Sequence, residues 1–171
     1  MTRWFTSDTH FGDHRVLNIG KRPFASREAM DAALIENWNA VVGPEDEVWH
    51  LGDFCLRGDA AAGLLARLNG TKHLVTGNND QAETLAAAGW ASVQPYAELL
   101  ADGVRLVLCH YPFRTWRDQG RGSVNLHGHS HGRLKPMPRQ YDVGVDVRGF
   151  RPVTLEELRG WRLALAPGAS G

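Results

Sequence analysis

The side chains best suited to chemistry in this sequence are histidines, aspartates and asparagines that lie in five short fragments. The chain has eight histidines among 171 residues, and histidine is the commonest metal-binding side chain. His127, His129 and His131 alternate within one short segment. In chain order, the fragments are Asp8-Thr9-His10, Gly52-Asp53, Gly77-Asn78-Asn79-Asp80, the single His110, and Gly128-His129-Ser130-His131. These residue types predict metal chemistry.

The spacing within the fragments allows several ligands to reach one place. Alternate residues of an extended segment point to the same side, so Asp8 and His10 can serve one site. Glycine directly precedes Asp53, Asn78 and His129, which permits sharp turns and close approach of the backbone. The fragments hold seven candidate ligands. That number is too large for one tetrahedral ion and suits two ions that share a bridging carboxylate.

Hydrophobic patterning predicts the elements that must position these fragments. It indicates strands over 2–7, 48–51, 73–76, 104–109, 124–127 and 141–147, and helices over 26–42, 60–68 and 80–88. Ser26 is the expected N-cap of the helix over 26–42, and Thr154 with Glu157 fits a capping box for a last short helix. This alternation of strands and helices predicts an α/β fold.

Five candidate ligands directly follow predicted strands: Asp8, Asp53, Asn78, His110 and His129. In open α/β sheets, ligands bind beyond the carboxyl ends of the strands. We therefore expect these five strand ends to form one convergent site.

Length and composition limit the class of protein. A chain of 171 residues suits a single domain over 1–171, and 43% apolar with 22% charged residues is typical of globular proteins. A net charge of zero argues against a protein that coats nucleic acid or anionic membranes. Cys55 and Cys109 are isolated thiols, expected in the core of a protein in a reducing compartment. Because the sequence has neither a secretory signal nor an apolar run of membrane-spanning length, we expect a cytoplasmic protein.

The five fragments, in this order, resemble the motifs of the calcineurin-like metallophosphoesterases, namely Asp-x-His, Gly-Asp, Gly-Asn-His-Asp/Glu, a single His and Gly-His-x-His. The resemblance runs from residue 8 to residue 131 and is closest to the small bacterial and phage-type members. It implies an α/β sandwich of two mixed β-sheets flanked by helices. It also implies two metal ions, and Mn, Fe or Zn suits the mixed oxygen and imidazole ligands. The implied ligands are Asp8, His10, Asp53 and His131 for the first ion, and Asp53, Asn78, His110 and His129 for the second.

Asn79 departs from the family pattern, which usually has a histidine at this position. That histidine is described as protonating the leaving group or contacting the phosphate, whereas asparagine keeps a hydrogen-bond donor but has no proton to transfer. We therefore expect a dinuclear phosphoesterase that favours phosphodiesters over alkyl monoesters, with Asn79 contacting the substrate. Asp80, which would support this loop, and His14, close to the first ligands, are the other catalytic candidates.

A basic segment is the candidate substrate-binding surface. Only Asp118 opposes its six cations, which are Arg114, Arg117, Arg121, Arg133, Lys135 and Arg139. Arg114 and Arg117 are the expected phosphate contacts, and an ordinary solvated surface is the alternative.

Four further side chains have weaker assignments. His127 either supports the metal ligands or simply packs in its strand, and Asp146 either supports them or belongs to a turn. His50 is expected in the core, and His73 on the surface.

Two alternative functions remain open. One is a phosphomonoesterase that acts on nucleotides or phosphoproteins, and the other is a non-catalytic metal-binding scaffold. The complete ligand set favours an enzyme. A metallo-β-lactamase-type hydrolase would need an aspartate where Arg133 stands, and a repair nuclease would need additional domains. The expected partner is a small phosphate ester, with nucleotides among the candidates; neither a membrane nor a stable nucleic-acid complex is expected, and the oligomeric state is not indicated.

Overall fold

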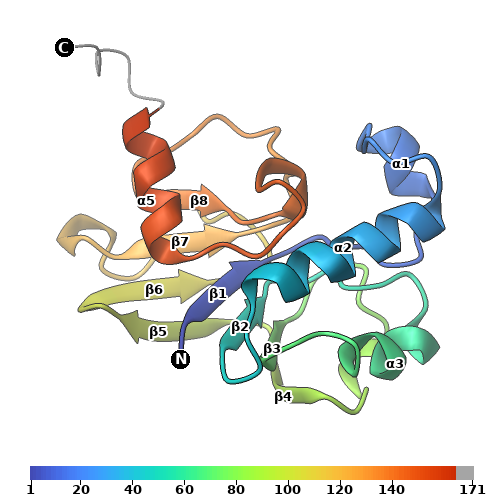
Figure 1. Cartoon of the computed structure of the whole chain (residues 1–171). Coiled ribbons are helices and arrows are strands. Elements are labelled where there is room, and N and C mark those ends of the chain that lie inside the picture. Colours follow the sequence, from blue (N-terminus) through green and yellow to red (C-terminus); the bar gives the residue numbers. More distant parts are fainter. Residues whose placement is uncertain (165–171) are drawn as a thin grey trace.

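Two four-stranded β-sheets form the centre of the fold (Figure 1). The computed structural model describes residues 1–164, apart from the side chains of residues 161–164. The first sheet has the order β1 (Arg3–Thr6), β2 (Glu47–His50), β3 (Thr71–Val75) and β4 (Trp90–Gln94). Every neighbouring pair of strands in it is parallel.

The second sheet combines both strand directions. Its order is β5 (Ala97–Ala101), β6 (Val104–Leu108), β7 (Val124–His127) and β8 (Gln140–Asp142). β5 and β6 form an antiparallel hairpin, whereas β6, β7 and β8 pair in parallel. The predicted architecture of two sheets flanked by helices is confirmed. Only the second sheet, however, is mixed.

The first sheet is covered on both faces, and β2 shows how its sequence achieves this. Val48 packs in a core that includes Trp38 of the helical layer. The next residue, Trp49, points to the other face and packs with Leu106 and Leu126 of the second sheet. Parallel strands buried on both faces are expected to be apolar throughout rather than alternating, and both Val48 and Trp49 are buried.

Five helices surround the sheets (Figure 1). They are α1 (Arg15–Ile19), α2 (Arg27–Val41), α3 (Ala61–Leu65), α4 (Ala82–Leu85) and α5 (Leu155–Ala164). The hydroxyl of Ser26 accepts a hydrogen bond from the Ala29 N–H, so the predicted N-cap of α2 is confirmed. The capping box before α5 is confirmed too, because Thr154 N–H donates to Glu157 Oε2 (2.8 Å) and Glu157 N–H donates to Thr154 Oγ1 (3.2 Å).

The predicted strand over 141–147 is confirmed only at its first two residues and is wrong for the rest. β8 ends at Asp142, whose Oδ1 accepts a hydrogen bond from the Gly144 N–H and turns the chain. Residues Val145–Val147 then form a 3₁₀ turn. Val143 and Val145 are fully buried. Alternate valines can thus be buried in a turn as well as in a strand, and the local sequence does not distinguish the two.

Other differences concern short elements. The sequence did not predict α1, β4 or β5, and α3 and α4 are shorter than the helices expected over 60–68 and 80–88. Within the described residues, no helix combines the length and apolar character needed to cross a membrane. The single domain over 1–171 stays a prediction, because residues 165–171 lie outside the described part of the chain.

The chain after β8 returns to the edge of β1. Ser7 and Gly144 form a parallel bridge, and Phe5 and Val153 an antiparallel one. The Val145 N–H donates to the Ser7 carbonyl over 3.0 Å. This link places the 3₁₀ turn beside the loop that follows β1.

Candidate metal centre

The predicted ligands follow the carboxyl ends of five strands and come together at one place. Their ligand atoms form two groups, one of Asp8, His10 and His131 and the other of Asp8, Asp53 and His110, each with all atoms within 4.8 Å of one another. Asp53 Oδ2 lies 3.5 Å from His10 Nε2 and 3.6 Å from His110 Nε2. Asp53 therefore stands between the two sets of ligands, as a bridging carboxylate must.

The first set has a ligand atom that lacks any protein partner. His10 Nε2 is buried and has no hydrogen-bond partner among the described residues. Burial lowers the pKa of His10 to about 4, so the ring is neutral and able to bind a metal at neutral pH. His131 Nε2 lies 3.7 Å from Asp8 Oδ1. The rings of His10 and His131 stack with their centroids 5.4 Å apart. A buried, unsatisfied nitrogen beside two carboxylates fits a cation.

The second set is organised around the Asn78 amide oxygen. Asn78 Oδ1 lies 3.0 Å from His110 Nε2 and 3.0 Å from His129 Nδ1. His110 Nδ1 lies 2.7 Å from the carbonyl of Leu51, to which it donates its proton, so Nε2 is the ring nitrogen left to act as an acceptor or metal ligand. Two acceptors that face each other at this distance fit a shared cation.

Asp8 and Asp53, the two carboxylates at the centre, differ in pKa. Burial raises the pKa of Asp8 to about 7, although His131 and His110 oppose this rise. Burial also acts to raise the pKa of Asp53, but His110 and the hydrogen bonds from Asn79 outweigh it and hold the pKa below its usual value. Asp53 is therefore the carboxylate that is ionised throughout the neutral range, and a bound cation would favour ionised Asp8 as well.

Most of the ligands adopt an unusual backbone conformation. Five of them have φ values between 46° and 66°, namely Asp8, His10, Asp53, His129 and His131. Residues other than glycine seldom occupy this left-handed region, and they cluster there at functional sites, where the surrounding structure holds the strain. This conformation lets each loop reverse abruptly after its strand and aim its side chain at the centre.

The glycines within the fragments permit close approach, as predicted. A Cβ atom on Gly77 would lie 2.4 Å from Asp53 Oδ1. A Cβ atom on Gly128 would lie 1.9 Å from Ser7 Oγ and 2.4 Å from Asp8 Oδ2. The loops can therefore meet around the two aspartates only if these positions lack a side chain.

Asp146 supports His131 and is itself held by an arginine that the sequence analysis missed. His131 Nδ1–H donates to Asp146 Oδ2 over 2.7 Å, which leaves Nε2 free to bind a metal. Burial acts to raise the pKa of Asp146, but hydrogen bonds from His131 and Arg22 hold it at about 2. Nothing in the local sequence marks Arg22, because its partner is 124 positions away.

Asn79 and Asp80 have different roles. Asn79 Nδ2 donates to Asp53 Oδ2 over 2.7 Å, and its backbone N–H donates to Asp53 Oδ1 over 2.8 Å. The Asp80 carboxylate instead accepts from the backbone N–H groups of Asp53, Phe54 and Gly77 at 2.7–3.0 Å. Asn79 thus lies at the centre, whereas Asp80 ties together the loops after β2 and β3.

The remaining histidines are spread around the centre. His14 is exposed at the start of α1 and makes no hydrogen bond to the ligands among the described residues. His127 is buried in β7, with Nδ1 2.9 Å from the Gly128 carbonyl. His50 is fully buried, as expected for a core residue. His73 is partly buried rather than on the surface, because its ring stacks on Trp49 with centroids 4.5 Å apart.

Neither Arg114 nor Arg117, the arginines expected to contact phosphate, lines the cleft beside His10 and His131. Arg117 Nη1 pairs with Glu98 Oε2 at 3.0 Å. Arg114 is exposed in the loop after β6. The residues that border His10 and His131 instead include Arg15 and Arg133. Substrate binding by Arg114 and Arg117 stays a prediction.

Comparison with known proteins shows the family of the chain and agrees with its fold. Residues 1–145 match the family description "Calcineurin-like phosphoesterase superfamily domain". The Gene 66 protein of Mycobacterium phage D29 is 34% identical over 178 positions, covering 84% of this chain and 87% of that protein. The uncharacterised protein MJ1445 of Methanocaldococcus jannaschii is 29% identical over 163 positions, covering 90% of this chain and 86% of that protein.

A solved structure shares the whole fold. The protein of unknown function AQ665 from Aquifex aeolicus aligns with a TM-score of 0.72 at 22% identity, covering 93% of this chain and 98% of that chain. The family match spans most of the sequence and includes all seven predicted ligand positions. The chain therefore belongs to the calcineurin-like phosphoesterase superfamily, a family of metal-dependent hydrolases of phosphate esters.

Proposed function

We propose that this protein is a dinuclear metal-dependent phosphodiesterase. The observation that supports this most directly is the position of Asp53, whose Oδ2 lies within 3.6 Å of ligand nitrogens from both sets. The first ion would be held by Asp8, His10, Asp53 and His131. The second would be held by Asp53, Asn78, His110 and His129. Mn, Fe and Zn are the proposed metals, because the donors combine carboxylate, amide oxygen and imidazole.

The pair of cations, when bound, would neutralise phosphate charge and lower the pKa of water at the site. The chain itself orients the ligands. The hydrogen bond from His131 to Asp146, and the one from His110 to Leu51, each hold an imidazole with Nε2 facing the centre. His131 and His110 can thus bind without reorganisation.

Asn79 supports the preference for diesters. Its Nδ2 lies 2.7 Å from Asp53 Oδ2, close enough to the centre to donate to a phosphate oxygen. An amide cannot deliver a proton to a departing alkoxide, and a positioned general acid is typically worth about 10²–10⁴-fold in rate. A diester also has one negative charge fewer than a monoester dianion, so it repels an incoming nucleophile less. We therefore expect good leaving groups and diesters to be favoured over alkyl monoesters.

The proposed substrate is a small phosphate ester, with nucleotides among the candidates, and the proposed location is the cytoplasm. Cys55 and Cys109 are both buried free thiols, which suits a reducing compartment. The two alternative functions predict different experimental results. A phosphomonoesterase would prefer alkyl monoesters, and a metal-binding scaffold would bind metal without turning over any of these substrates.

The test is to measure kcat/KM of the Mn²⁺-loaded protein for bis(4-nitrophenyl) phosphate, 4-nitrophenyl phosphate and glycerol phosphate. We expect the aryl diester to be the best substrate and the alkyl monoester the worst. Asn79→His should improve monoester hydrolysis more than diester hydrolysis, because it introduces a group that can transfer a proton. A native preference for glycerol phosphate would contradict the proposal, and His14→Ala and His127→Ala would then identify the acid.

A further inference from the structure

A cleft of about 250 Å³ opens directly from the metal centre, between α1 and the loop after β7. Complete small-molecule sites usually measure roughly 300–1,000 Å³, so this cleft suits one part of a substrate. Its lining includes His10, Asn79 and His131 from the centre, Arg15 and Ile19 from α1, and Arg133 from the loop. A group attached to a phosphate at the centre would therefore enter this cleft.

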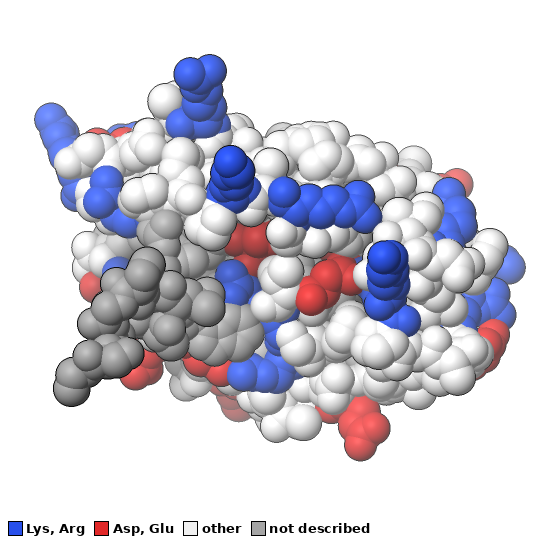
Figure 2. All heavy atoms as spheres, turned by 90° about the horizontal axis from the view of Figure 1, so that it is seen from above, with Lys and Arg blue, Asp and Glu red and all other residues white. Residues whose placement is uncertain are grey.

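Arg133 brings an uncompensated positive charge to the cleft. Its Nη2–H donates to the Ile19 carbonyl over 3.3 Å, which spans the cleft from the loop to the end of α1. Among the described residues it forms no ion pair with a carboxylate, so its Nε and Nη1 groups remain available as donors. On the face shown in Figure 2, Lys and Arg side chains stand around a small group of acidic side chains.

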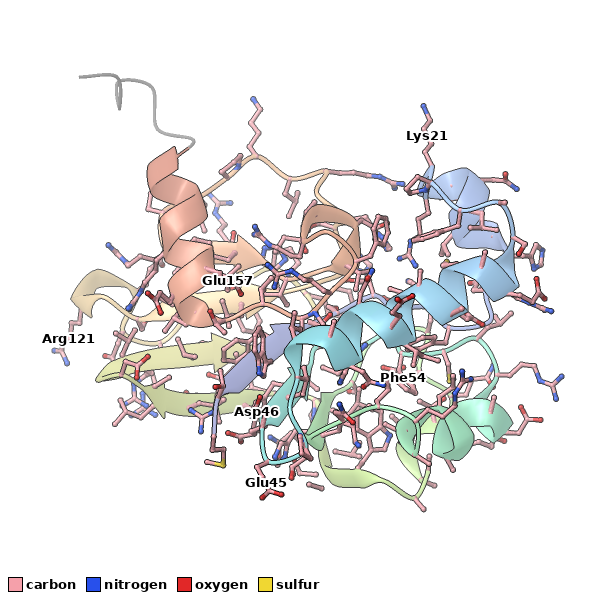
Figure 3. The ribbon with its side chains drawn as sticks, in the orientation of Figure 1. Lys21, Glu45, Asp46, Phe54, Arg121 and Glu157 are labelled. Carbon is pink, nitrogen blue, oxygen red and sulfur yellow. The ribbon has the colours of Figure 1, made fainter. Side chains whose placement is uncertain are left out.

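Arg15 stands on the other wall and is held in place. Its Nε donates to Asp13 Oδ1 over 2.8 Å and its Nη2 to Asp13 Oδ2 over 2.7 Å, while Asp13 is buried. This two-point pairing fixes the guanidinium and offsets its charge, so Arg15 offers the Nη1–H donor while Arg133 supplies the uncompensated positive charge. Lys21, two residues beyond α1, points into solvent away from the sheets (Figure 3).

The same wall offers apolar surface. Ile19 is 66% exposed, and Val16, one turn earlier on α1, is buried beneath it in the cleft lining. An exposed isoleucine next to two guanidinium groups suits a ligand with both an organic body and an anionic end. The organic body would pack on α1, and the anionic end would pair with the arginines.

We propose that this cleft binds the leaving part of the substrate and that this part carries a phosphate of its own, held by Arg133 with Arg15 beside it. The inference rests on the proposed function and extends it to a substrate class, a diester in which one esterified group is itself phosphorylated, such as a nucleoside phosphate unit. The guanidinium fork matches phosphate oxygens in geometry and charge.

Arg117 and Arg121, which precede Arg133 in the basic segment, do not offer the same site. Arg117 pairs with Glu98 and approaches Asp118, so nearby carboxylates already offset its charge. Arg121 projects at the end of the molecule opposite α1 (Figure 3). Arg117 and Arg121 can therefore be distinguished from the cleft residues Arg15 and Arg133 by substitution.

The test compares two nucleotides that differ by one phosphate. Binding of thymidine 5′-monophosphate and thymidine 3′,5′-bisphosphate to the Mn²⁺-loaded protein is measured by titration calorimetry. We expect the bisphosphate to bind at least about tenfold more tightly than the monophosphate, because it gains one guanidinium–phosphate pair. Arg133→Ala should remove this difference, and Arg133→Lys should keep part of it, because a point charge replaces the fork. Arg57→Ala, at an exposed arginine paired with Asp59, should leave it unchanged.

The inference is overturned if the native protein binds both nucleotides equally, or if Arg117→Ala rather than Arg133→Ala removes the difference. Hydrolysis of bis(4-nitrophenyl) phosphate is measured in parallel in the native protein and in Arg57→Ala, and it should be the same in both, because Arg57 pairs with Asp59 and does not line the cleft. Failure of that hydrolysis in the native protein would contradict the proposed function alone, because the binding comparison needs no turnover.

Discussion

Arg22 and Asp146 are joined by two parallel hydrogen bonds, from Nε to Oδ1 over 2.8 Å and from Nη2 to Oδ2 over 2.9 Å. The same guanidinium donates to the carbonyls of Asp8 (2.6 Å) and Thr9 (2.9 Å), and its side chain is completely buried. Because Asp146 also accepts the proton of His131 Nδ1, this one arginine holds ligands from the first and last fragments of the chain in register.

Asp146→Asn should weaken metal binding without removing any ligand. The amide can no longer accept from both Arg22 and His131 as a carboxylate does, and losing such a supporting partner typically costs about 10–100-fold in metal affinity. Affinity is measured by competition with a metal chelator, alongside Asp118→Asn as a control at a carboxylate that pairs with Arg105. Native affinity in Asp146→Asn would show that His131 needs no support.

Gly77→Ala should disrupt the centre, whereas Gly63→Ala should be tolerated. At Gly77 the new Cβ would lie 2.4 Å from Asp53 Oδ1, while at Gly63, inside α3, it would meet nothing within 4 Å. Alanine is favoured over glycine in a helix by about 0.5–1 kcal/mol, so Gly63→Ala should raise the free energy of unfolding. Urea denaturation of both variants checks this. A Gly77→Ala protein with native stability and metal content would contradict the described packing.

The free energy of unfolding of the metal-free protein should fall as the pH drops below about 6.5, with His50 as one cause. Burial lowers the pKa of His50 to about 3 from its usual value of 6.5. Between these values the unfolded chain binds a proton at this position and the folded chain does not, so stability decreases as the pH falls. Each proton so bound contributes a slope of about 1.4 kcal/mol per pH unit.

His50→Gln tests this contribution. Glutamine can retain a donor toward Thr9 Oγ1, which lies 2.9 Å from His50 Nε2 and itself donates to the Phe54 carbonyl. Denaturation between pH 7 and pH 4 should show a shallower pH dependence in this variant. Identical slopes in both proteins would mean that His50 takes up no additional proton on unfolding.

The ligands could be predicted from the sequence because the features that identify them are local. Asp8, Asp53 and His129 each follow a short apolar run within a few residues, and glycines flank the last two. Strand ends and turn residues are properties of neighbouring positions, so the α/β fold class and the convergence of the loops followed from them. The two-sheet architecture was instead implied by the resemblance to the family.

The support around the ligands could not be predicted, because it depends on distant contacts. Arg22 lies in a stretch without periodic pattern, and only the fold brings it to Asp146. The expectation that Arg114 and Arg117 contact substrate followed from charge density along the chain. The cleft instead includes Arg15 and Arg133, because α1 is a five-residue helix too short to produce a periodic signal.

The most direct test of the account is the metal content and activity of Asp53→Asn. Asp53 stands between both ligand sets, so an amide there removes the shared charge from both ions. With Asp59→Asn as an exposed control, we measure bound metal by mass spectrometry, folding by circular dichroism, and hydrolysis of bis(4-nitrophenyl) phosphate. The native protein should bind about two ions per chain, and folded Asp53→Asn should lose both ions and at least about a hundredfold in activity. A folded Asp53→Asn protein that keeps its metal and its activity would contradict the bridging role of Asp53.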